Sequence, residues 1–185
     1  RCVEVRLFSK YPVSKVLSGD RVAPSGPLRG DYRVEFANGN ALDIHSDGEL
    51  FLLNDKLVAR LDREEYVARV LEREAKPEPA EAAKALAVAI RTYLLQNATR
   101  NGDCLSIDDS SNRQRVAPRP ATAEARAIAA WTSDLVLAGT QVTYHSDLSA
   151  PDKLSWQQAV EQARAGQRYD AILLHAYPRA SLSRW

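Results

Sequence analysis

Hydrophobic and polar residues alternate over the first third of the chain, as is typical of β-strands. The stretch CVEVRLF alternates, and residues 32–62 contain the turn sequences NGN, DG and ND between apolar runs. Such turns between alternating segments favour hairpins. We therefore predict about four or five short strands in a meander over residues 1–62, with a Pro- and Gly-containing loop at residues 23–30.

Helical spacing of hydrophobic residues follows in the middle of the chain. A first helix is predicted from a capping-box pattern at Asp62 and Glu65 to about Ala75, where the sequence KPEP interrupts it. A second helix is predicted from about Ala80 to Asn97. It is rich in Ala and apolar around much of its circumference, which predicts a central, buried helix.

The remainder of the chain mixes helices with strands. Residues 101–120 form a long polar segment bounded by prolines, which predicts a loop. Residues 121–133 predict a helix, and residues 135–147 predict two strands joined by a tight AGT turn. Ser155 with Gln158 predicts a capped helix ended by Gly166, and YDAILLHAYP predicts a last short helix.

The order of these elements predicts the fold class. β structure comes first, and helices with further short strands follow, which indicates an α+β fold with an antiparallel sheet. A length of 185 residues fits one domain. We expect a single domain over residues 1–185, with residues 1–62 as a β-rich lobe and residues 63–185 as the α/β part that carries the site.

Composition and charge argue against several classes of function. The formal net charge is +1, so nothing favours nucleic acid or an acidic membrane as a partner. No apolar run approaches the ~20 residues that a membrane-spanning helix needs. The chain contains no Met, so we expect a processed or excised part of a longer product.

The two cysteines, Cys2 and Cys104, leave two interpretations open. In an exported protein they would form a disulfide that closes a loop of ~100 residues. Otherwise they are two unrelated thiols. Together with the scattered His45, His145 and His175 they make no recognisable zinc pattern, and we expect no metal and no cofactor.

One glutamate of the first predicted helix is set apart by its position. At ~100° per residue, Val67, Val70 and Leu71 define the buried face of that helix, and Glu74 falls in the middle of it. Glu72, in contrast, is predicted to face solvent. A buried carboxylate must pair, accept hydrogen bonds or take up a proton.

Two interpretations of Glu74 follow. A carboxyl group whose pKa is raised by burial acts as a general acid near neutral pH. Alternatively, the last helical turn frays and Glu74 reaches water, or it pairs with a basic residue such as Arg91.

Four segments of the chain, in order, match the motifs of one family. EEYVARVLEREAKP and EAAKALAVAIRTYLL are similar to EEYVxGVVxxEMP and EALKAQAVAARTYA, and TYHSDLS is similar to FYHSSSGG. The closing LSWQQAVEQARAGQRYDAILLHAYPRASL is similar to MSQYGAxGMAxxGxSYEEILKHYYPGTEL. These patterns are those of the SpoIID/LytB family of bacterial cell-wall proteins, which includes the sporulation lytic transglycosylase. The chain resembles a divergent branch of that family.

The divergence is clearest at a zinc motif. Family members often carry CDTTHCQ, whose Cys and His residues bind zinc in some of them, whereas this chain reads DDSSNRQ. Asp108, Asn112 and Arg113 stand at those positions when the motif is aligned on Gln114. Arg is not a zinc ligand, and the sulfur ligands are gone, so we predict no structural zinc.

The resemblance implies cleavage of peptidoglycan glycan strands by a lytic transglycosylase-type mechanism, with Glu74 as the single acid/base. A hydrolase usually needs two carboxylates, whereas one suffices when the 6-hydroxyl of muramic acid closes an anhydro ring. The residues implied in substrate binding are Arg91, Tyr93, Tyr144, His145, Ser146 and Ser155. Trp131 and Trp156 are candidates for stacking on sugar rings, although aromatic residues at helical spacing belong more often to the core.

Two other functions stay open. The chain is a noncatalytic relative that binds wall glycan or a protein, or it activates other wall enzymes, as LytB-type members do. It is also similar to uncharacterised predicted secreted proteins encoded beside bacterial α2-macroglobulins, which implies such an envelope protein as a partner. The resemblance implies a periplasmic or secreted location in the bacterial cell envelope.

Overall fold

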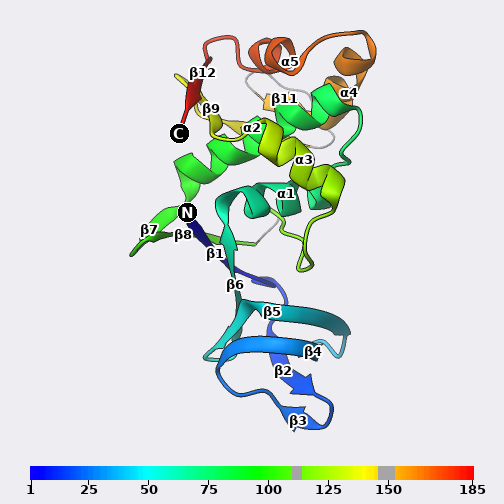
Figure 1. The fold of residues 1–185 in the computed structure, drawn as a ribbon, viewed down its shortest axis with the longest axis vertical. Coiled ribbons are helices and arrows are strands. Elements are labelled where there is room, and N and C mark those ends of the chain that lie inside the picture. Colours follow the sequence, from blue (N-terminus) through cyan, green and yellow to red (C-terminus); the bar gives the residue numbers. More distant parts are fainter. Residues whose placement is uncertain (110–113, 146–152) are drawn as a thin grey trace. The chain divides into compact units, whose positions relative to one another are not determined.

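The chain folds as two units, each assembled from two separate segments (Figure 1). The computed structural model describes residues 1–109, 114–145 and 153–185. Unit 1 contains residues 1–63 and 99–120, and unit 2 contains residues 64–98 and 121–185. The fold class is α+β, as predicted. The β-rich unit ends within one residue of the expected boundary, but it also includes the 99–120 segment, which we had assigned to the α/β part.

Unit 1 contains a mixed sheet whose described strands lie in the order β3-β2-β4-β5-β6-β1-β8-β7. Its neighbours are antiparallel except β1 and β8, which run parallel. The strands are β1 (Cys2–Arg6), β2 (Val13–Ser18), β3 (Arg21–Val22), β4 (Gly26–Phe36), β5 (Ala41–Leu53), β6 (Lys56–Asp62), β7 (Thr99–Asn101) and β8 (Cys104–Asp108).

Two of the three predicted turns are confirmed. NGN joins β4 to β5, and ND joins β5 to β6 with positive φ at Asn54 and Asp55. The DG turn is wrong, because Gly48 lies inside β5 with φ 106°. A Cβ on Gly48 would lie 2.9 Å from Arg29 Cζ, so the flexible Arg29 side chain would have to shift, and the positive φ itself favours glycine. The predicted loop at 23–30 is likewise strand from Gly26 onward.

The predicted polar loop of residues 101–120 begins instead as part of the sheet. β7 and β8 form a hairpin in which Asn101 pairs with Cys104, and Gly102 has φ 62° in the turn. β8 then lies parallel to β1, with Cys2 opposite Cys104. This strand was not predicted because it lies in a segment whose many polar residues were interpreted as a loop.

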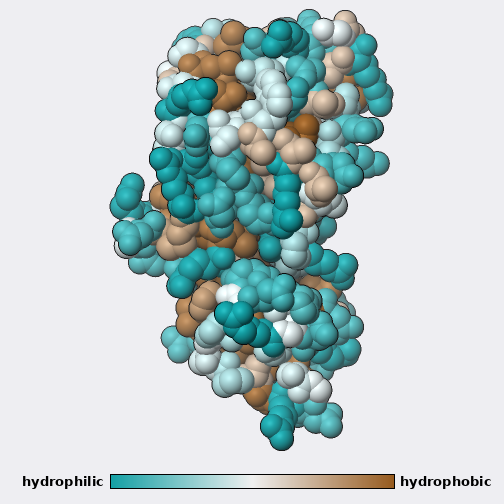
Figure 2. Space-filling view, viewed as in Figure 1, coloured by the Kyte–Doolittle hydropathy of each residue, from teal (hydrophilic) through white to brown (hydrophobic). Residues whose placement is uncertain are grey.

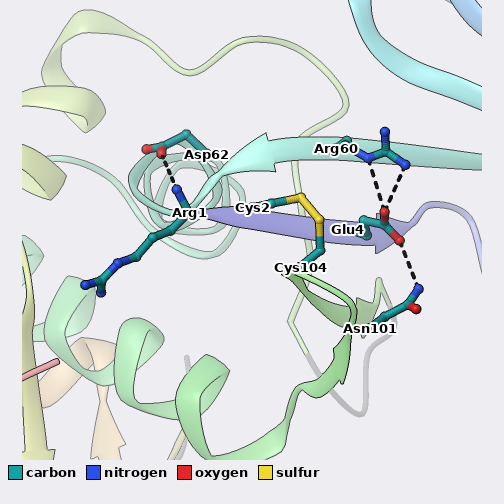
Figure 3. Close-up of a disulfide and its surroundings, with 7 residues drawn as sticks. All are labelled: Arg1, Cys2, Glu4, Arg60, Asp62, Asn101 and Cys104. Atoms are coloured by element: carbon teal, nitrogen blue, oxygen red, sulfur yellow. Dashed lines mark hydrogen bonds and ion pairs between the residues drawn. A yellow bond between two sulfur atoms is a disulfide. The ribbon is translucent and has the colours of Figure 1, made fainter.

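A disulfide joins Cys2 to Cys104, which decides between the two interpretations of these cysteines (Figure 3). It links β1 to β8 across a sequence separation of 102 residues. Beside it, the Glu4 carboxylate accepts hydrogen bonds from Arg60 Nε at 3.1 Å and from Asn101 Nδ2 at 3.4 Å (Figure 3). The disulfide therefore ties β1 to β8, and the contacts of Glu4 tie β1 to β6 and to β7, which lies beyond β8.

Unit 2 is built around α2 (Ala80–Asn97), whose bounds match the prediction. α2 packs against α3, α4, α5 and β9 (Figure 1). Its residues from Ala85 to Thr92 are all buried, as expected of a central helix. The other helices are α1 (Arg63–Glu74), α3 (Ala123–Trp131), α4 (Trp156–Arg164) and α5 (Tyr169–Ala176), and the strands are β9 (Leu135–Ala138), β10 (Thr143–His145), β11 (Lys153–Ser155) and β12 (Ser181–Arg184).

The two strands predicted within residues 135–147 are present as β9 and β10, but they do not pair with each other as a hairpin. β9 pairs with β12 in antiparallel fashion, whereas β10 pairs with β11 in parallel. The Gln96 side chain binds the segment that connects β9 to β10. Its amide nitrogen donates to the Thr140 carbonyl and its oxygen accepts from Val142 N, each at 2.8 Å. This bonding replaces the contacts that a tight turn would make.

Candidate functional site

Glu74 is the last residue of α1 and is half-buried. Val67, Val70 and Leu71 are fully buried, as the helical wheel predicts. Burial is not limited to that face, however, because the six consecutive residues from Tyr66 to Leu71 are all buried. α1 is therefore enclosed over most of its surface, and the wheel separates its carboxylates less sharply than expected.

The predicted contrast between a solvent-facing Glu72 and a buried Glu74 is not seen, because both residues are half-buried. The Glu72 carboxylate accepts a hydrogen bond from Thr122 N at 3.1 Å. Thr122 is the N-cap of α3, where its hydroxyl accepts from Ala125 N. Glu72 thus contributes to the start of α3, because the free backbone N–H groups of a helix N-terminus need acceptors.

Glu65 lies at the centre of a second set of contacts to the start of α3. Its carboxylate accepts hydrogen bonds from Arg69 Nε at 3.0 Å, from Ala121 N at 2.9 Å and from Arg126 Nε at 2.8 Å. Burial raises the pKa of Glu65, but the hydrogen bonds from Arg126, Ala121 and Arg69 outweigh it and hold this pKa below its ordinary value. Glu65 is an ionised structural carboxylate.

Arg91 is fully buried, and its guanidinium donors are used within the protein. It forms an ion pair with Glu64, donates to the Leu135 carbonyl at 2.9 Å, and donates to the Ala129 carbonyl and Thr132 Oγ1 at 3.2 Å each. Its carboxylate partner is thus Glu64 rather than Glu74. Arg91 therefore stabilises unit 2 by connecting α2 to α1, α3 and β9, and it does not present a donor to a ligand.

Tyr93 and Tyr144 are the predicted binding residues that the structure brings into contact. Both are half-buried, and their rings meet nearly edge-on, with centroids 6.0 Å apart and planes at 77°. Tyr144 lies in β10, beside His145, which aligns with Ser155 across the β10–β11 pair. Ser146 lies outside the described residues. Tyr93 and Tyr144 are thus two members of the predicted sugar-binding set whose rings lie in contact.

Ser155 has the predicted capping role, whereas its part in sugar binding stays a prediction. It is buried, and its hydroxyl accepts from Gln158 N at 3.3 Å as the N-cap of α4, which confirms the predicted cap. Tyr177 ties the same strands together, since its hydroxyl accepts from Leu154 N at 3.1 Å and donates to the Thr143 carbonyl. These hydrogen bonds therefore stabilise β10, the strand that carries Tyr144 of the tyrosine pair.

One cluster in the described residues has metal-ligating side chains close together, namely Cys2, Glu4 and Cys104. Its two sulfur atoms are joined in the disulfide and offer no thiolate. Of the residues aligned with the zinc motif, Asp108 pairs with Arg6, and Asn112 and Arg113 lie outside the described residues. The cluster therefore has the chemistry of a structural disulfide rather than of a metal centre.

A group that the sequence reading missed is the exposed row Asp31–His45–Asp47 in unit 1. His45 Nδ1 lies 2.8 Å from Asp31 Oδ1, and its Nε2 lies 2.9 Å from Asp47 Oδ1. The bonds to Asp31 and then Asp47 raise the pKa of His45 above its usual value. The i, i+2 spacing of His45 and Asp47 within a strand was the available signal, since such residues share a face.

Comparison with known proteins gives two similarities. Residues 152–185 match a family described as predicted secreted protein (DUF2300), a segment that carries α4, α5 and β12. This match confirms the expected periplasmic or secreted location. None of the helices in residues 1–109, 114–145 and 153–185 is long and apolar enough to cross a membrane.

The second similarity covers the entire chain. It is 54% identical over 191 residues to the uncharacterised protein YfaQ of Escherichia coli strain K12. The match includes 100% of this chain and 35% of the relative, so the chain spans about a third of that protein's length. No solved structure matches the chain.

Proposed function

We propose that this chain cleaves peptidoglycan glycan strands by a lytic transglycosylase-type mechanism, with Glu74 as the single acid/base. The observation that carries the proposal is the half-buried position of Glu74 at the end of a helix whose preceding residues 66–71 are buried. The first step of the proposed reaction needs the Glu74 carboxyl in its protonated form. The motif around Glu74 supplies the reaction class.

The proposed reaction requires Glu74 to donate one proton and then to accept another. The Glu74 carboxylic acid donates its proton to the glycosidic oxygen as the bond from muramic acid breaks. The carboxylate then accepts the proton of the muramic acid 6-hydroxyl as that oxygen attacks the anomeric carbon. The enzyme is regenerated without water, and the product carries a 1,6-anhydro ring. Tyr93 and Tyr144 are the side chains that we propose to bind the sugar.

The alternative is a noncatalytic wall protein that binds glycan, binds an envelope protein such as an α2-macroglobulin, or activates another wall enzyme. The internal engagement of Arg91 and Ser155 favours it, because two proposed binding residues then serve the fold. Both functions share the expectation of a glycan- or wall-directed surface, and they differ in whether Glu74 transfers a proton.

Digestion of peptide-stripped glycan strands separates the two functions. The wild-type protein is expected to produce anhydromuramyl ends, detected by mass spectrometry, and Glu74→Gln is expected to produce none. Glu72→Gln is a matched control on the same helix, because glutamine still offers an oxygen to Thr122 N. Absence of cleavage by the wild type, with strands still retained in a pull-down, would refute the enzyme and leave the binding protein.

A further inference from the structure

Large hydrophobic side chains are exposed at few places among the described residues. Figure 2 shows hydrophilic residues over most of the face in view, with hydrophobic residues in small groups. The exposed large hydrophobic residues are Tyr11, Val22, Leu53, Leu95, Trp131 and Leu174. Trp131 is the largest of them, and 53% of its surface is exposed. An exposed indole loses the free energy of burial, so its setting calls for an explanation.

The Trp131 ring is held in place from two sides. Lys84 Nζ lies 3.8 Å from the ring centroid, over the face of the indole. The Tyr169 ring lies 5.2 Å away, with its plane at 84° to the indole. Cation–π and edge-on aromatic contacts each have a preferred geometry. The indole is therefore oriented while more than half of it stays accessible.

Glu81 binds both residues that hold the ring, Lys84 through its side chain and Tyr169 through its backbone N–H. One carboxylate oxygen of Glu81 accepts from Lys84 Nζ at 2.8 Å, and the other accepts from the Tyr169 backbone N–H at 3.1 Å. Lys84 and Glu81 are largely buried, with side chains 17% and 29% exposed. Glu81, Lys84, Trp131 and Tyr169 thus form a closed set of contacts from α2, α3 and α5, which we call the Trp131 platform.

The charges of the platform indicate which ligand it suits. The Glu81 carboxylate balances the Lys84 ammonium that lies on the indole, so the four residues of the platform carry no net charge. The Trp131 ring contacts the Lys84 ammonium and the Tyr169 phenol ring, and 53% of the Trp131 surface stays accessible to a ligand. A pyranose ring is neutral, with C–H groups on one face and hydroxyl groups at its rim. Such a ring can stack on a single oriented indole.

We propose that the Trp131 platform is a sugar-stacking subsite that binds one pyranose ring of a glycan strand. It would hold a strand independently of proton transfer by Glu74. The inference rests on the proposed function for the identity of the glycan, and it adds a binding site that the motif comparison does not contain. The preoriented ring lowers the entropy lost when the sugar binds.

Binding is best measured in the Glu74→Gln background, so that strands stay intact. The probes are peptide-stripped glycan strands and the tetramer of N-acetylglucosamine, titrated by calorimetry. Adding Trp131→Ala is expected to weaken binding about tenfold, and adding Trp131→Phe to weaken it less. Leu174→Ala is the matched control, since Leu174 is also exposed in unit 2, and it is expected to bind as the parent does.

The outcomes separate this inference from the proposed function. Equal affinity of the parent and Trp131→Ala, or no binding of either probe, would overturn the platform, and circular dichroism and thermal melting show whether each variant is folded. Loss of retention of an envelope protein by Trp131→Ala, with glycan binding unchanged, would overturn it as well. Binding that depends on Trp131 in a protein that never cuts glycan would refute the enzyme alone.

Discussion

The guanidinium of Arg91 in α2 forms an ion pair with the carboxylate of Glu64 in α1, and the Arg91 side chain is fully buried. Removing one partner of a buried pair leaves an uncompensated charge, which typically costs about 3–5 kcal/mol. Glu64 is 23% exposed, and Arg91 keeps two carbonyls and a hydroxyl as acceptors, so we expect the low end. Glu64→Ala should lower the free energy of unfolding by about 3 kcal/mol, measured by urea denaturation.

The Arg126–Glu65 pair provides the comparison for that measurement. Arg126 is 53% exposed, and exposed ion pairs contribute only about 0–1 kcal/mol. Arg126→Ala should therefore destabilise the protein by less than Glu64→Ala does. Equal effects of the two changes would show that the Arg91 ion pair has no special weight in unit 2.

The contrast between helix bounds and the role of Arg91 shows what the sequence reveals. The bounds of α2 were predictable because they depend on local signals, namely an Ala-rich apolar run after a proline. The partners of Arg91 lie 27, 38 and 44 positions away along the chain, at Glu64, Ala129 and Leu135. No local pattern contains that information, so a motif that places Arg91 near a glutamate does not show which glutamate it binds.

The same reasoning explains the errors in the sheets. Gly48 follows an aspartate in a turn-like dipeptide, but it lies inside β5, where the pairing with β4 continues on both sides of it across a register shift. β9 pairs with β12, more than 40 positions away, rather than with the nearby β10. Glu74 was singled out in the sequence by helical periodicity. The exposed position of Trp131, in contrast, depends on the packing of three helices. The sequence therefore did not decide whether Trp131 belongs to the core or to the surface.

The disulfide between Cys2 and Cys104 is expected to stabilise unit 1. It closes a loop with a sequence separation of 102 residues, for which the chain-entropy model gives about 4–5 kcal/mol. The double variant Cys2→Ser, Cys104→Ser should unfold at a lower temperature than the oxidised wild type. Reductant should lower the melting temperature of the wild type and leave that of the variant unchanged. An identical melting temperature for both proteins without reductant would contradict the prediction.

His45 is expected to titrate above its ordinary pKa of 6.5, because Asp31 and then Asp47 stabilise the imidazolium. The ring proton signals of His45 followed by NMR against pH give this value directly. Asp31→Asn and Asp47→Asn should each lower the pKa of His45. Because the group is exposed, high salt should also reduce the shift. A pKa of His45 that is the same in wild type and Asp31→Asn would exclude the proposed cause.

Glu65 is expected to make the stability of the protein depend on pH. Its pKa in the folded state is lower than its ordinary value of 4.5, despite burial, because Arg126, Ala121 N and Arg69 donate to the carboxylate. A carboxylate with a lowered pKa contributes stability that is complete above the unfolded-state pKa and is lost as the pH falls through the folded-state pKa. The difference in unfolding free energy between wild type and Glu65→Gln should therefore be constant near neutral pH.

That difference should shrink as the pH falls below 4.5, measured by urea denaturation at a series of pH values. Arg126→Gln is the matched variant, because it keeps the carboxylate and removes the partner that lowers its pKa most. It should retain part of the acid-induced loss, since Arg69 and Ala121 N still donate to Glu65. A wild-type advantage over Glu65→Gln that stays the same from neutral pH to pH values well below 4.5 would show that Glu65 binds its proton equally in both states, and the contacts at the start of α3 would then owe nothing to its charge.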